Sequence, residues 1–326
     1  MVRLLCLLSP AKTLDLSAPA VRACSQPTLL EDAHELVKQL QKLSQAKLKT
    51  LLGVSDALAK LNHDRFKSFK FVDAASDPLE PNATFKQAVL AFNGPAYLGL
   101  AAADLSAVDL EYAQDHLAIL CGLYGVLRPL DLIQPYRLEM GQRFANDRGK
   151  DLYAFWGDSI AHQLNVRLRQ GDDGHDKILV NVASQEYFKS VKAEALDADV
   201  RVVDCVFLDD GKVKSAYAKR ARGLMCRYLQ QNRVDSLDGI RKFDLEGYSY
   251  SAGASSDDTF VFTRSVAQAK AAVNNIREMA KAKTAATGKG KKEEKASKRV
   301  KEEKEEKEEE PSLGLRRSAR KKHKSS

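Results

Sequence analysis

Short apolar runs alternate with longer stretches of helical character along most of this chain, and this alternation is the feature that most restricts its fold. The runs that we predict to be strands are rich in apolar and β-branched residues: Arg3–Leu8, Ala88–Phe92, Ile119–Leu123, Ile178–Ala183, Arg201–Leu208 and Phe260–Thr263. Strands that alternate with helices pack into a sheet that the helices cover. We therefore predict a mixed α/β fold, with one globular domain over residues 1–280 and a central sheet surrounded by helices.

The stretches between these strands carry signals for helices. Thr28 is predicted to cap a helix over Leu29–Leu43, with Glu31 and Asp32 in its first turn. Further helices are predicted over Ser106–Leu117, Leu152–Arg169 and Ser265–Lys283.

Charge divides the chain into two parts. Residues 281–326 hold 17 Lys and Arg against 9 Asp and Glu, whereas residues 1–280 hold 35 of each sign, so the tail accounts for the whole formal net charge of +8. The tail has almost no apolar residues and cannot bury enough surface to offset its ordering entropy. We predict that residues 281–326 are disordered, and that any nucleic-acid site on the folded part comes from local clusters of basic residues.

Two features of the sequence bear on the compartment of the protein: the length of its apolar runs and the spacing of its cysteines. No apolar run approaches the roughly 20 residues that span a bilayer, and the five cysteines are far apart, without a C-x-x-C pair, which favours a reducing compartment. We predict a soluble cytoplasmic protein without membrane contact. The basic cluster over residues 315–324 is either a solubilising tail or a nuclear localisation signal or nucleic-acid patch, so a nuclear location is the alternative.

No metal or cofactor is predicted. The six histidines are scattered, without H-x-x-x-H or H-E-x-x-H spacing. The glycine-rich signatures of nucleotide-binding loops and the G-x-S-x-G signature of hydrolases do not occur either.

A basic segment follows the predicted strand Arg201–Leu208. A turn at Asp209–Gly211 is predicted to lead into a second hairpin arm, Lys212–Tyr217, and then into a helix. Between residues 212 and 233 there are seven basic residues and no acid. Such a run is either a solvated helix face or a surface that contacts a polyanion.

The segment around Gly53 resembles the helix-hairpin-helix element of DNA repair proteins. Ser44 is predicted to cap a helix over Gln45–Leu52, and Ser55 another that runs toward Phe69, so that the element spans about residues 45–69. A glycine lets the backbone approach a phosphate, and free N–H groups at the next helix start face the anion. The residues predicted to contact phosphate are Gly53, Val54, Ser55, Lys47, Lys49 and Lys60. The alternative is an ordinary turn between two helices.

Lys12 is the candidate catalytic residue. It lies in the loop Ser9–Thr13, directly after the first strand, and loops at strand ends favour catalytic and anion-binding groups. The lysine either clamps a phosphate, acts as an amine nucleophile, or is simply exposed.

A loop dense in Gly, Pro, Tyr and Arg follows the strand Ile119–Leu123. Arg128 and Arg137 in this loop can clamp a phosphate or carboxylate bidentately. They can equally pair with Asp131 and Glu139 as structural bridges.

Several long blocks resemble the peroxide stress protein YaaA family in matching order. They are SPAKTLD at Ser9–Asp15, LAILCGLYGVLRPLDLIQPYRLEMG at Leu117–Gly141, GKDLYAFWGD at Gly149–Asp158, NVASQEYFKSV at Asn181–Val191 and YAKRARGLMCRY at Tyr217–Tyr228. The resemblance covers about Leu4 to Phe262, whereas the lysine-glutamate tail and Cys121 depart from the family pattern.

This resemblance implies a role in resisting hydrogen peroxide, by limiting free iron and oxidative damage to DNA and proteins. It also implies a single α/β domain with a DNA-binding helix-hairpin-helix element and a positively charged cleft. The cleft residues that match family blocks are Lys12, Arg128, Arg137, Lys189, Lys219, Arg220 and Arg222.

We therefore expect a non-enzymatic protein that binds double-stranded or structured DNA, mainly through phosphates. The alternative is an enzyme acting on nucleic acid or a nucleotide-like substrate, with Lys12 as nucleophile or phosphate clamp and Glu186 or Tyr187 assisting. An enzyme requires Lys12, Glu186 and Arg137 to converge in one pocket, whereas a binder needs only a basic groove beside the hairpin.

Overall fold

A computed structural model of the chain describes residues 2–18, 21–72, 80–82, 84–170, 176–278 and 281. Contacts group Met1–Ala269 into one compact unit, and a second unit begins at Lys270. Residues 266–278 are helical. The predicted disorder of residues 281–326, including the basic cluster at 315–324, lies outside the described residues except for Lys281. None of the described helices is long and apolar enough to cross a membrane.

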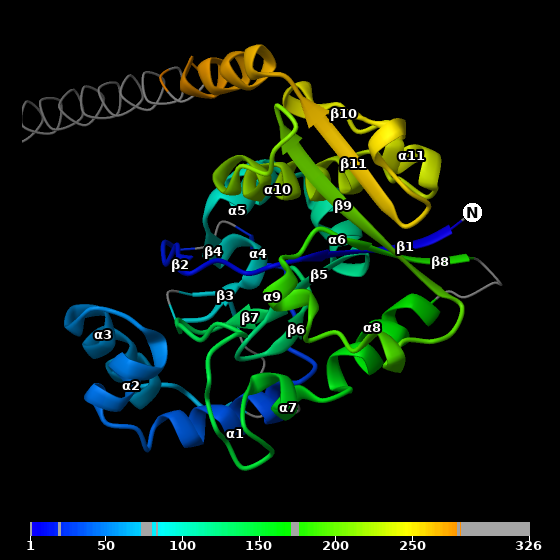
Figure 1. Cartoon of the computed structure of the whole chain (residues 1–326). Coiled ribbons are helices and arrows are strands. Elements are labelled where there is room, and N and C mark those ends of the chain that lie inside the picture. Colours follow the sequence, from blue (N-terminus) through cyan, green and yellow to red (C-terminus); the bar gives the residue numbers. More distant parts are fainter. Residues whose placement is uncertain are drawn as a thin grey trace, which may run out of the picture. The chain divides into compact units, whose positions relative to one another are not determined.

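A seven-stranded sheet forms the centre of the first unit (Figure 1). Its strands, in spatial order, are β10 (Ser249–Tyr250), β11 (Thr259–Arg264), β9 (Val200–Asp209), β8 (Asp176–Asn181), β1 (Val2–Leu8), β5 (Leu117–Cys121) and β6 (Gly125–Leu127). The five strands from β11 to β5 are parallel, and β10 and β6 are antiparallel edge strands. Two small antiparallel pairs accompany this sheet: β2 (Thr13–Leu14) with β4 (Phe92–Asn93), and β3 (Lys86–Gln87) with β7 (Leu132–Ile133).

Helices connect and cover the strands. In chain order they are α1 (Leu30–Leu40), α2 (Gln45–Leu52), α3 (Asp56–Lys67), α4 (Ala88–Ala91), α5 (Pro95–Leu100), α6 (Ala107–His116), α7 (Leu152–Trp156), α8 (Ser159–Arg169), α9 (Gln185–Phe188), α10 (Ser215–Gln231) and α11 (Leu237–Arg241). Short 3₁₀ turns lie at Ala102–Asp104, Ala193–Ala195, Leu245–Gly247 and Ala252–Ala254. In the view of Figure 1, α10 and α5 lie above β1, and α8 lies below it.

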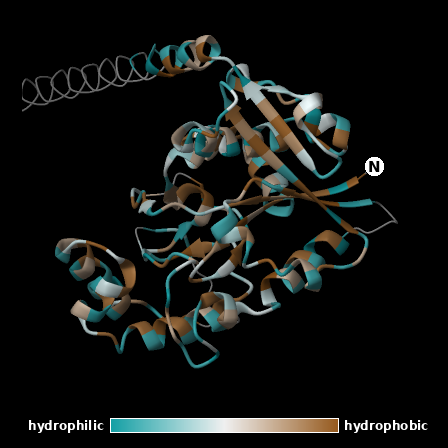
Figure 2. Ribbon diagram, viewed as in Figure 1, coloured by the Kyte–Doolittle hydropathy of each residue, from teal (hydrophilic) through white to brown (hydrophobic). Residues whose placement is uncertain are grey.

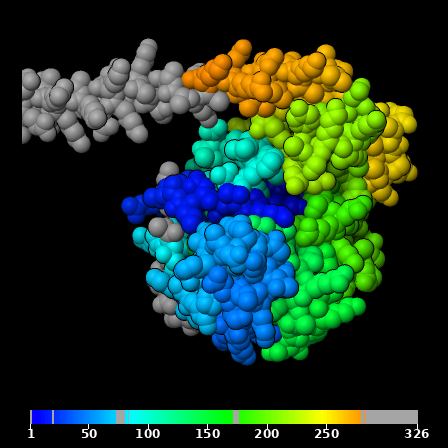
Figure 3. All heavy atoms as spheres, turned by 60° about the vertical axis from the view of Figure 1, so that its left-hand side comes forward, coloured from blue at the N-terminus to red at the C-terminus, as the bar shows by residue number. Residues whose placement is uncertain are grey.

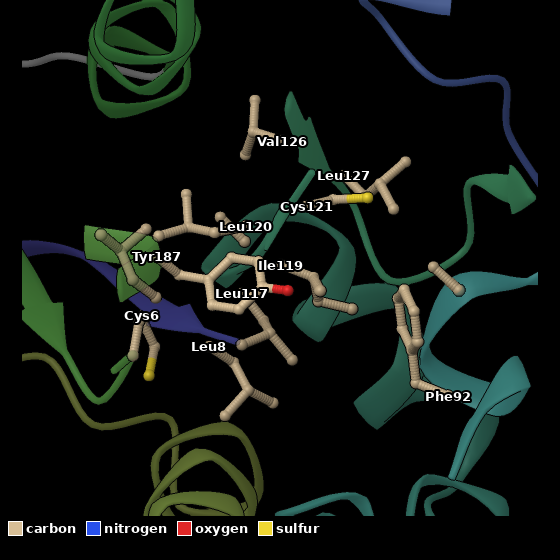
Figure 4. Packing of buried hydrophobic residues seen from close by; sticks show 14 of the residues in the cluster. Cys6, Leu8, Phe92, Leu117, Ile119, Leu120, Cys121, Val126, Leu127 and Tyr187 are labelled. Carbon is tan, nitrogen blue, oxygen red and sulfur yellow. The ribbon is translucent and has the colours of Figure 1, made fainter. Parts of the chain in front are cut away.

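The core is built around β1. Leu4 to Leu8 are all buried, because β1 pairs with β8 on one side and β5 on the other while helices cover it. Figure 2 shows hydrophobic residues along the strands of this sheet, and Figure 4 shows β1 and β5 side chains meeting in one apolar cluster. The predicted mixed α/β fold is confirmed.

Most predicted strands are confirmed within about two residues, but Ala88–Phe92 is wrong. Ala88–Ala91 form the short helix α4, and only Phe92 enters a strand. The backbone N–H groups of Ala88 and Val89 donate to Asp131 and Pro129, so this buried run is fixed by a neighbouring loop. Periodicity alone cannot distinguish a short buried strand from a buried helix.

Two helix predictions and one hairpin prediction also need correction. Thr28 does not cap α1, because Leu29 occupies the N-cap position without a side-chain hydrogen bond. The predicted helix Leu152–Arg169 is broken at Gly157, which has φ +49° and separates α7 from α8. The second hairpin arm, Lys212–Tyr217, is absent from the described structure. After a single bridge between Asp209 and Lys212, α10 begins at Ser215, in a stretch of good helix formers.

Candidate functional site

A cavity of about 370 Å³ opens outside the carboxyl ends of β1 and β8. From β1 the chain moves to β5 on one side, and it then returns to β8 on the other side of β1. The chain leaves β1 toward β5 and leaves β8 toward β9, in opposite directions across the sheet. Open α/β sheets bind ligands at such a switch in strand order. The topology thus provides a physical reason for a site at this position.

The β1 loop contributes Lys12 to the rim of the cavity. Ser9 and Pro10 end the strand, and the Lys12 Nζ then lies 2.5 Å from the Glu139 Oε2. The other oxygen of Glu139 accepts a hydrogen bond from Arg137 at 3.1 Å. The lysine side chain is 62 % exposed, whereas that of Glu139 is 14 % exposed. Glu139 is thus held between two cations, one at the rim and one inside.

A serine pair joins the two strand ends. The Ser9 Oγ accepts a hydrogen bond from the Ser184 backbone N–H at 2.9 Å, which ties the β1 loop to the loop after β8. Two residues further on, the Glu186 Oε1 accepts a hydrogen bond from the Gly141 N–H at 2.9 Å. Lys12, Arg137 and Glu186 therefore line one cavity, as the enzyme hypothesis requires.

Helix α10 supplies the opposite wall. Lys219 and Arg222 are three residues apart, so they share a helix face, and both line the cavity. Gly223 and Gly99 allow α10 and α5 to cross at backbone contact, since a Cβ on Gly99 would lie 3.1 Å from the Leu224 N. This crossing sets how far Lys219 and Arg222 on α10 lie from the carboxyl ends of the strands.

Tyrosine rings form the apolar part of the lining. The Tyr97 hydroxyl donates to the Ser9 carbonyl at 3.1 Å, and the Tyr136 hydroxyl lies 2.6 Å from the Cys121 Sγ. Figure 4 shows the Tyr187 ring within the apolar cluster. Burial raises the pKa of all three phenols well above the ordinary value. Tyr187 therefore remains protonated near neutral pH and can donate a hydrogen bond but cannot serve as a base.

The α2–α3 hairpin forms separately from this cavity. Ser44 caps α2 by accepting from the Lys47 N–H, and Ser55 caps α3 by accepting from the Leu58 N–H, both as predicted. Gly53 has φ +60° and ends α2 in the left-handed conformation, with open space where a Cβ would lie. Figure 3 shows this hairpin on the same face as the darker blue N-terminal segment that contains the β1 loop.

Two of the three lysines predicted beside this turn have acidic partners. Lys49 pairs with Asp56 at 2.8 Å, and Lys60 pairs with Asp64 at 2.7 Å. The Lys49 side chain is 44 % exposed and the other three are more than half exposed, so these pairs are weak and a phosphate could replace the carboxylates. Lys47 is exposed.

The remaining predicted cleft residues do not line the cavity. Arg128 pairs with Asp131 at 3.0 Å and donates to the Gln26 carbonyl. These contacts fit the alternative in which Arg128 forms a structural ion pair. Arg220 binds Glu246 with a shortest N–O distance of 2.6 Å. The Lys189 ammonium lies 5.0 Å from the centre of the Tyr153 ring. A role in DNA binding stays a prediction for these three residues.

Sequence reasoning missed the segment at the start of α5. Asn93, Gly94 and Tyr97 line the cavity, although their part of the chain carries no catalytic motif. The antiparallel pairing of β2 with β4 brings Asn93 opposite Thr13. The one available signal was Gly94-Pro95, a pair typical of a turn.

No group of three or more His, Cys, Asp or Glu side chains that could hold a metal ion occurs within the described residues. The four buried thiols, Cys6, Cys121, Cys205 and Cys226, come from separate segments. Burial raises the pKa of Cys121 to about 11, so this thiol stays protonated.

Comparison with known proteins identifies close relatives. The model of the family described as peroxide stress protein YaaA matches residues 4–254. A UPF0246 protein of Burkholderia mallei is 54% identical over 262 residues, which cover 79% of this chain and 97% of the relative. A UPF0246 protein of Burkholderia pseudomallei shows the same identity and coverage. One from Burkholderia multivorans is 51% identical over 266 residues, which cover 80% of this chain and 98% of the relative.

Proposed function

The chain belongs to the peroxide stress protein YaaA family, as its sequence blocks predicted, and on this premise we propose that it limits oxidative damage by binding DNA through backbone phosphates. One observation carries the proposal: the α2–α3 turn is built and exposed in the way that phosphate binding requires. Gly53 keeps the turn open, and Ser55 starts a helix directly after it.

The turn offers peptide donors to an anion. The N–H groups of Ser55, Asp56 and Ala57 donate to no acceptor within the described part of the chain, because they precede the first helical hydrogen bonds of α3. Donors at the start of a helix, together with its dipole, favour a phosphate oxygen. Contacts of this kind read the DNA backbone and carry no base sequence. Affinity should accordingly depend steeply on salt and weakly on sequence.

Replacing Gly53 with aspartate is expected to weaken duplex DNA binding about tenfold at low salt relative to Gly53→Asn. Both residues tolerate positive φ, and a Cβ at this position meets no atom within 4 Å. The two side chains have nearly the same shape, so they differ mainly in charge beside the proposed phosphate. Repulsion between two charges about 4 Å apart is roughly 1 kcal/mol in water and more at an interface. The measurement is a DNA titration by fluorescence anisotropy over a salt series.

The full chain serves in every arm of this titration, so the basic tail contributes equally to both variants. The difference between Asp and Asn should shrink as salt rises, because screening weakens exposed charge interactions. Equal affinities of the two variants at low salt would remove the hairpin from the DNA-binding surface.

An effect on free iron is the second part of the family expectation. We propose it on family membership alone and assign no residue to it. Binding to DNA and a change in free iron are separable, since the first is measured with purified protein and the second in cells.

A second candidate function is favoured by one specific observation. Lys12, Arg137 and Glu186 line the same cavity, which is the convergence that an enzyme acting on nucleic acid or a nucleotide-like substrate requires. Amine nucleophiles are activated by burial in apolar surroundings, whereas Lys12 is 62 % exposed and paired with Glu139. An exposed, ion-paired Lys12 is better suited to hold a phosphate than to act as a nucleophile.

If this second function holds, Lys12→Ala should lower conversion of DNA or a nucleotide about a hundredfold, the effect of removing an electrostatic contact to reacting oxygens. Lys12→Arg keeps the positive charge, so it should retain most activity if Lys12 is a clamp and none if it is a nucleophile. Products are followed by mass spectrometry. An activity that Lys12→Ala leaves intact would exclude this role.

A further inference from the structure

The cavity at the strand ends contains more positive charge than its own acids neutralise. Glu139 is shared by Lys12 and Arg137, and Glu186 accepts a backbone N–H. The two cations on α10 that line the cavity, Lys219 and Arg222, have no ion pair or hydrogen bond within the described chain. The lining thus holds four cations and two carboxylates, which favours an anionic ligand on the α10 side.

Arg222 is the more informative of the two cations on α10. Its side chain is half-buried, and burial lowers the pKa of its guanidinium. Placing a cation away from water without a partner is unfavourable. A bound phosphate would supply that partner through a charge-assisted, bidentate contact, which the planar guanidinium suits.

The same cavity has room and apolar surface for more than a phosphate. Its volume of about 370 Å³ lies within the range of small-molecule sites. The rings of Tyr97, Tyr136 and Tyr187 are part of the lining, and the Tyr97 hydroxyl is already bonded to Ser9. Asn93 and Thr13 bring polar groups beside these rings. A ligand that fills the cavity would combine a phosphate with an organic part that is flat enough to lie against aromatic rings.

We propose that this cavity binds a nucleoside monophosphate, with the phosphate held by Arg222 and Lys219 and the nucleoside toward the tyrosines. The ligand is either a free nucleotide or the 5′-phosphorylated end of a DNA strand, since both present the same chemistry. This site is separate from the hairpin, and it rests on the proposed function only in the choice of a nucleoside as the organic part.

The first test is calorimetric titration of the full chain at low salt with 2′-deoxyadenosine 5′-monophosphate, inorganic phosphate and deoxyadenosine. The monophosphate should bind at least tenfold more tightly than either part alone, because only it engages both walls of the cavity. No saturable binding of the monophosphate, or equal binding of inorganic phosphate, would overturn the proposal.

Variants of α10 locate the binding site. Arg222→Met keeps the aliphatic volume and should weaken monophosphate binding about tenfold, the 1.4 kcal/mol equivalent of one charge-assisted contact. Lys214→Met changes net charge equally but does not line the cavity, so its effect should stay below about twofold. Lys219→Met replaces an exposed side chain, so it should fold normally. It tests the same phosphate contact if Arg222→Met fails to fold. Unchanged binding in folded Arg222→Met and Lys219→Met would refute the assignment.

Duplexes with a 5′-phosphate or a 5′-hydroxyl distinguish the two sources. Tighter binding of the phosphorylated duplex that Arg222→Met abolishes identifies a strand end as the ligand, and equal binding of both duplexes with intact monophosphate binding identifies a free nucleotide. Failure of this site leaves the hairpin proposal untouched, because Gly53→Asp is measured on internal duplex contacts. Conversely, if the monophosphate binds but DNA binding does not depend on the hairpin, the proposed function is refuted and the cavity proposal stands.

Discussion

Gly223→Ala is expected to destabilise the protein by about 3 kcal/mol, the upper end of what overpacking usually costs. A Cβ at this position would lie far inside van der Waals contact distance of the Ala96 carbonyl oxygen and 2.8 Å from the Leu100 N. Both atoms belong to the backbone of α5, so no side-chain rotation relieves the contact. The helices would have to separate, and the loss is measured as the free energy of unfolding in urea.

The expected loss of stability is opposite in sign to the usual effect of replacing glycine with alanine in a helix. Glycine to alanine inside an exposed helix normally stabilises by about 1 kcal/mol, because glycine has the poorer helix propensity. Gly253 is the matched control, since a Cβ there meets nothing within 4 Å. Gly253→Ala should change stability by less than about 0.5 kcal/mol. A Gly223→Ala protein as stable as the parent would mean that α5 and α10 do not cross at backbone contact.

The crossing matters for function because Arg222 directly precedes Gly223 in the chain, so the contact between α5 and α10 also positions the Arg222 side chain at the cavity. Monophosphate binding should therefore weaken in Gly223→Ala even under conditions in which the variant is folded. The same loss without any change in stability would point instead to a direct role of this backbone in the ligand site.

Local chemistry explains which parts of the fold the sequence could predict. Ser44, Gly53 and Ser55 are cap residues whose effect depends on their immediate neighbours, and α2 and α3 begin where they indicate. Strands β1 and β9 have seven and ten residues, so their apolar and β-branched composition was enough to predict them. Ala88–Ala91 is short and apolar, so hydrogen bonds to a distant loop decided its conformation. A sequence pattern contains no information on such contacts.

The sequence could predict a site near Lys12, but it could not predict which charged residues pair with one another there. Lys12 follows a buried strand, and this position alone suggested an anion or catalytic site. Its partner Glu139 is more than a hundred residues away, and the ion pair exists because β1 and β5 are neighbours. The seven basic residues of 212–233 looked alike in sequence. In the structure Arg220 and Arg233 have acidic partners, whereas Arg222 faces the cavity.

Arg264→Met is expected to cost 3–5 kcal/mol, the range for breaking a buried ion pair by removing one partner. The Arg264 Nε donates to the Asp209 Oδ1 at 2.6 Å, and the two side chains are 3 % and 1 % exposed. Tyr248 donates to the other Asp209 oxygen at 2.9 Å. Without the guanidinium, the Asp209 carboxylate would remain buried beside a single neutral donor. Urea unfolding again measures the loss.

A second ion pair between neighbouring segments provides the control for this loss. Arg201 on β9 pairs with Asp258, which immediately precedes β11, at 2.9 Å, but its side chain and that of Asp258 are 40 % and 67 % exposed. Arg201→Met should therefore cost less than about 1 kcal/mol, the usual limit for exposed pairs. Similar losses in the two variants would show that the Asp209 pair is not buried in solution.

The Arg264 variant should also weaken ligand binding at the cavity, because the pair is linked to α10. Arg264 donates to the Glu246 carbonyl at 3.1 Å, and the Glu246 carboxylate holds Arg220, one helical turn before Leu224. Arg220→Met removes only this last link and leaves Asp209 paired, so it should lower stability less than Arg264→Met. If both variants weaken monophosphate binding while Arg201→Met does not, the ion-pair chain positions α10. Unaffected binding in folded Arg264→Met and Arg220→Met would show that the α5 crossing alone fixes Lys219 and Arg222.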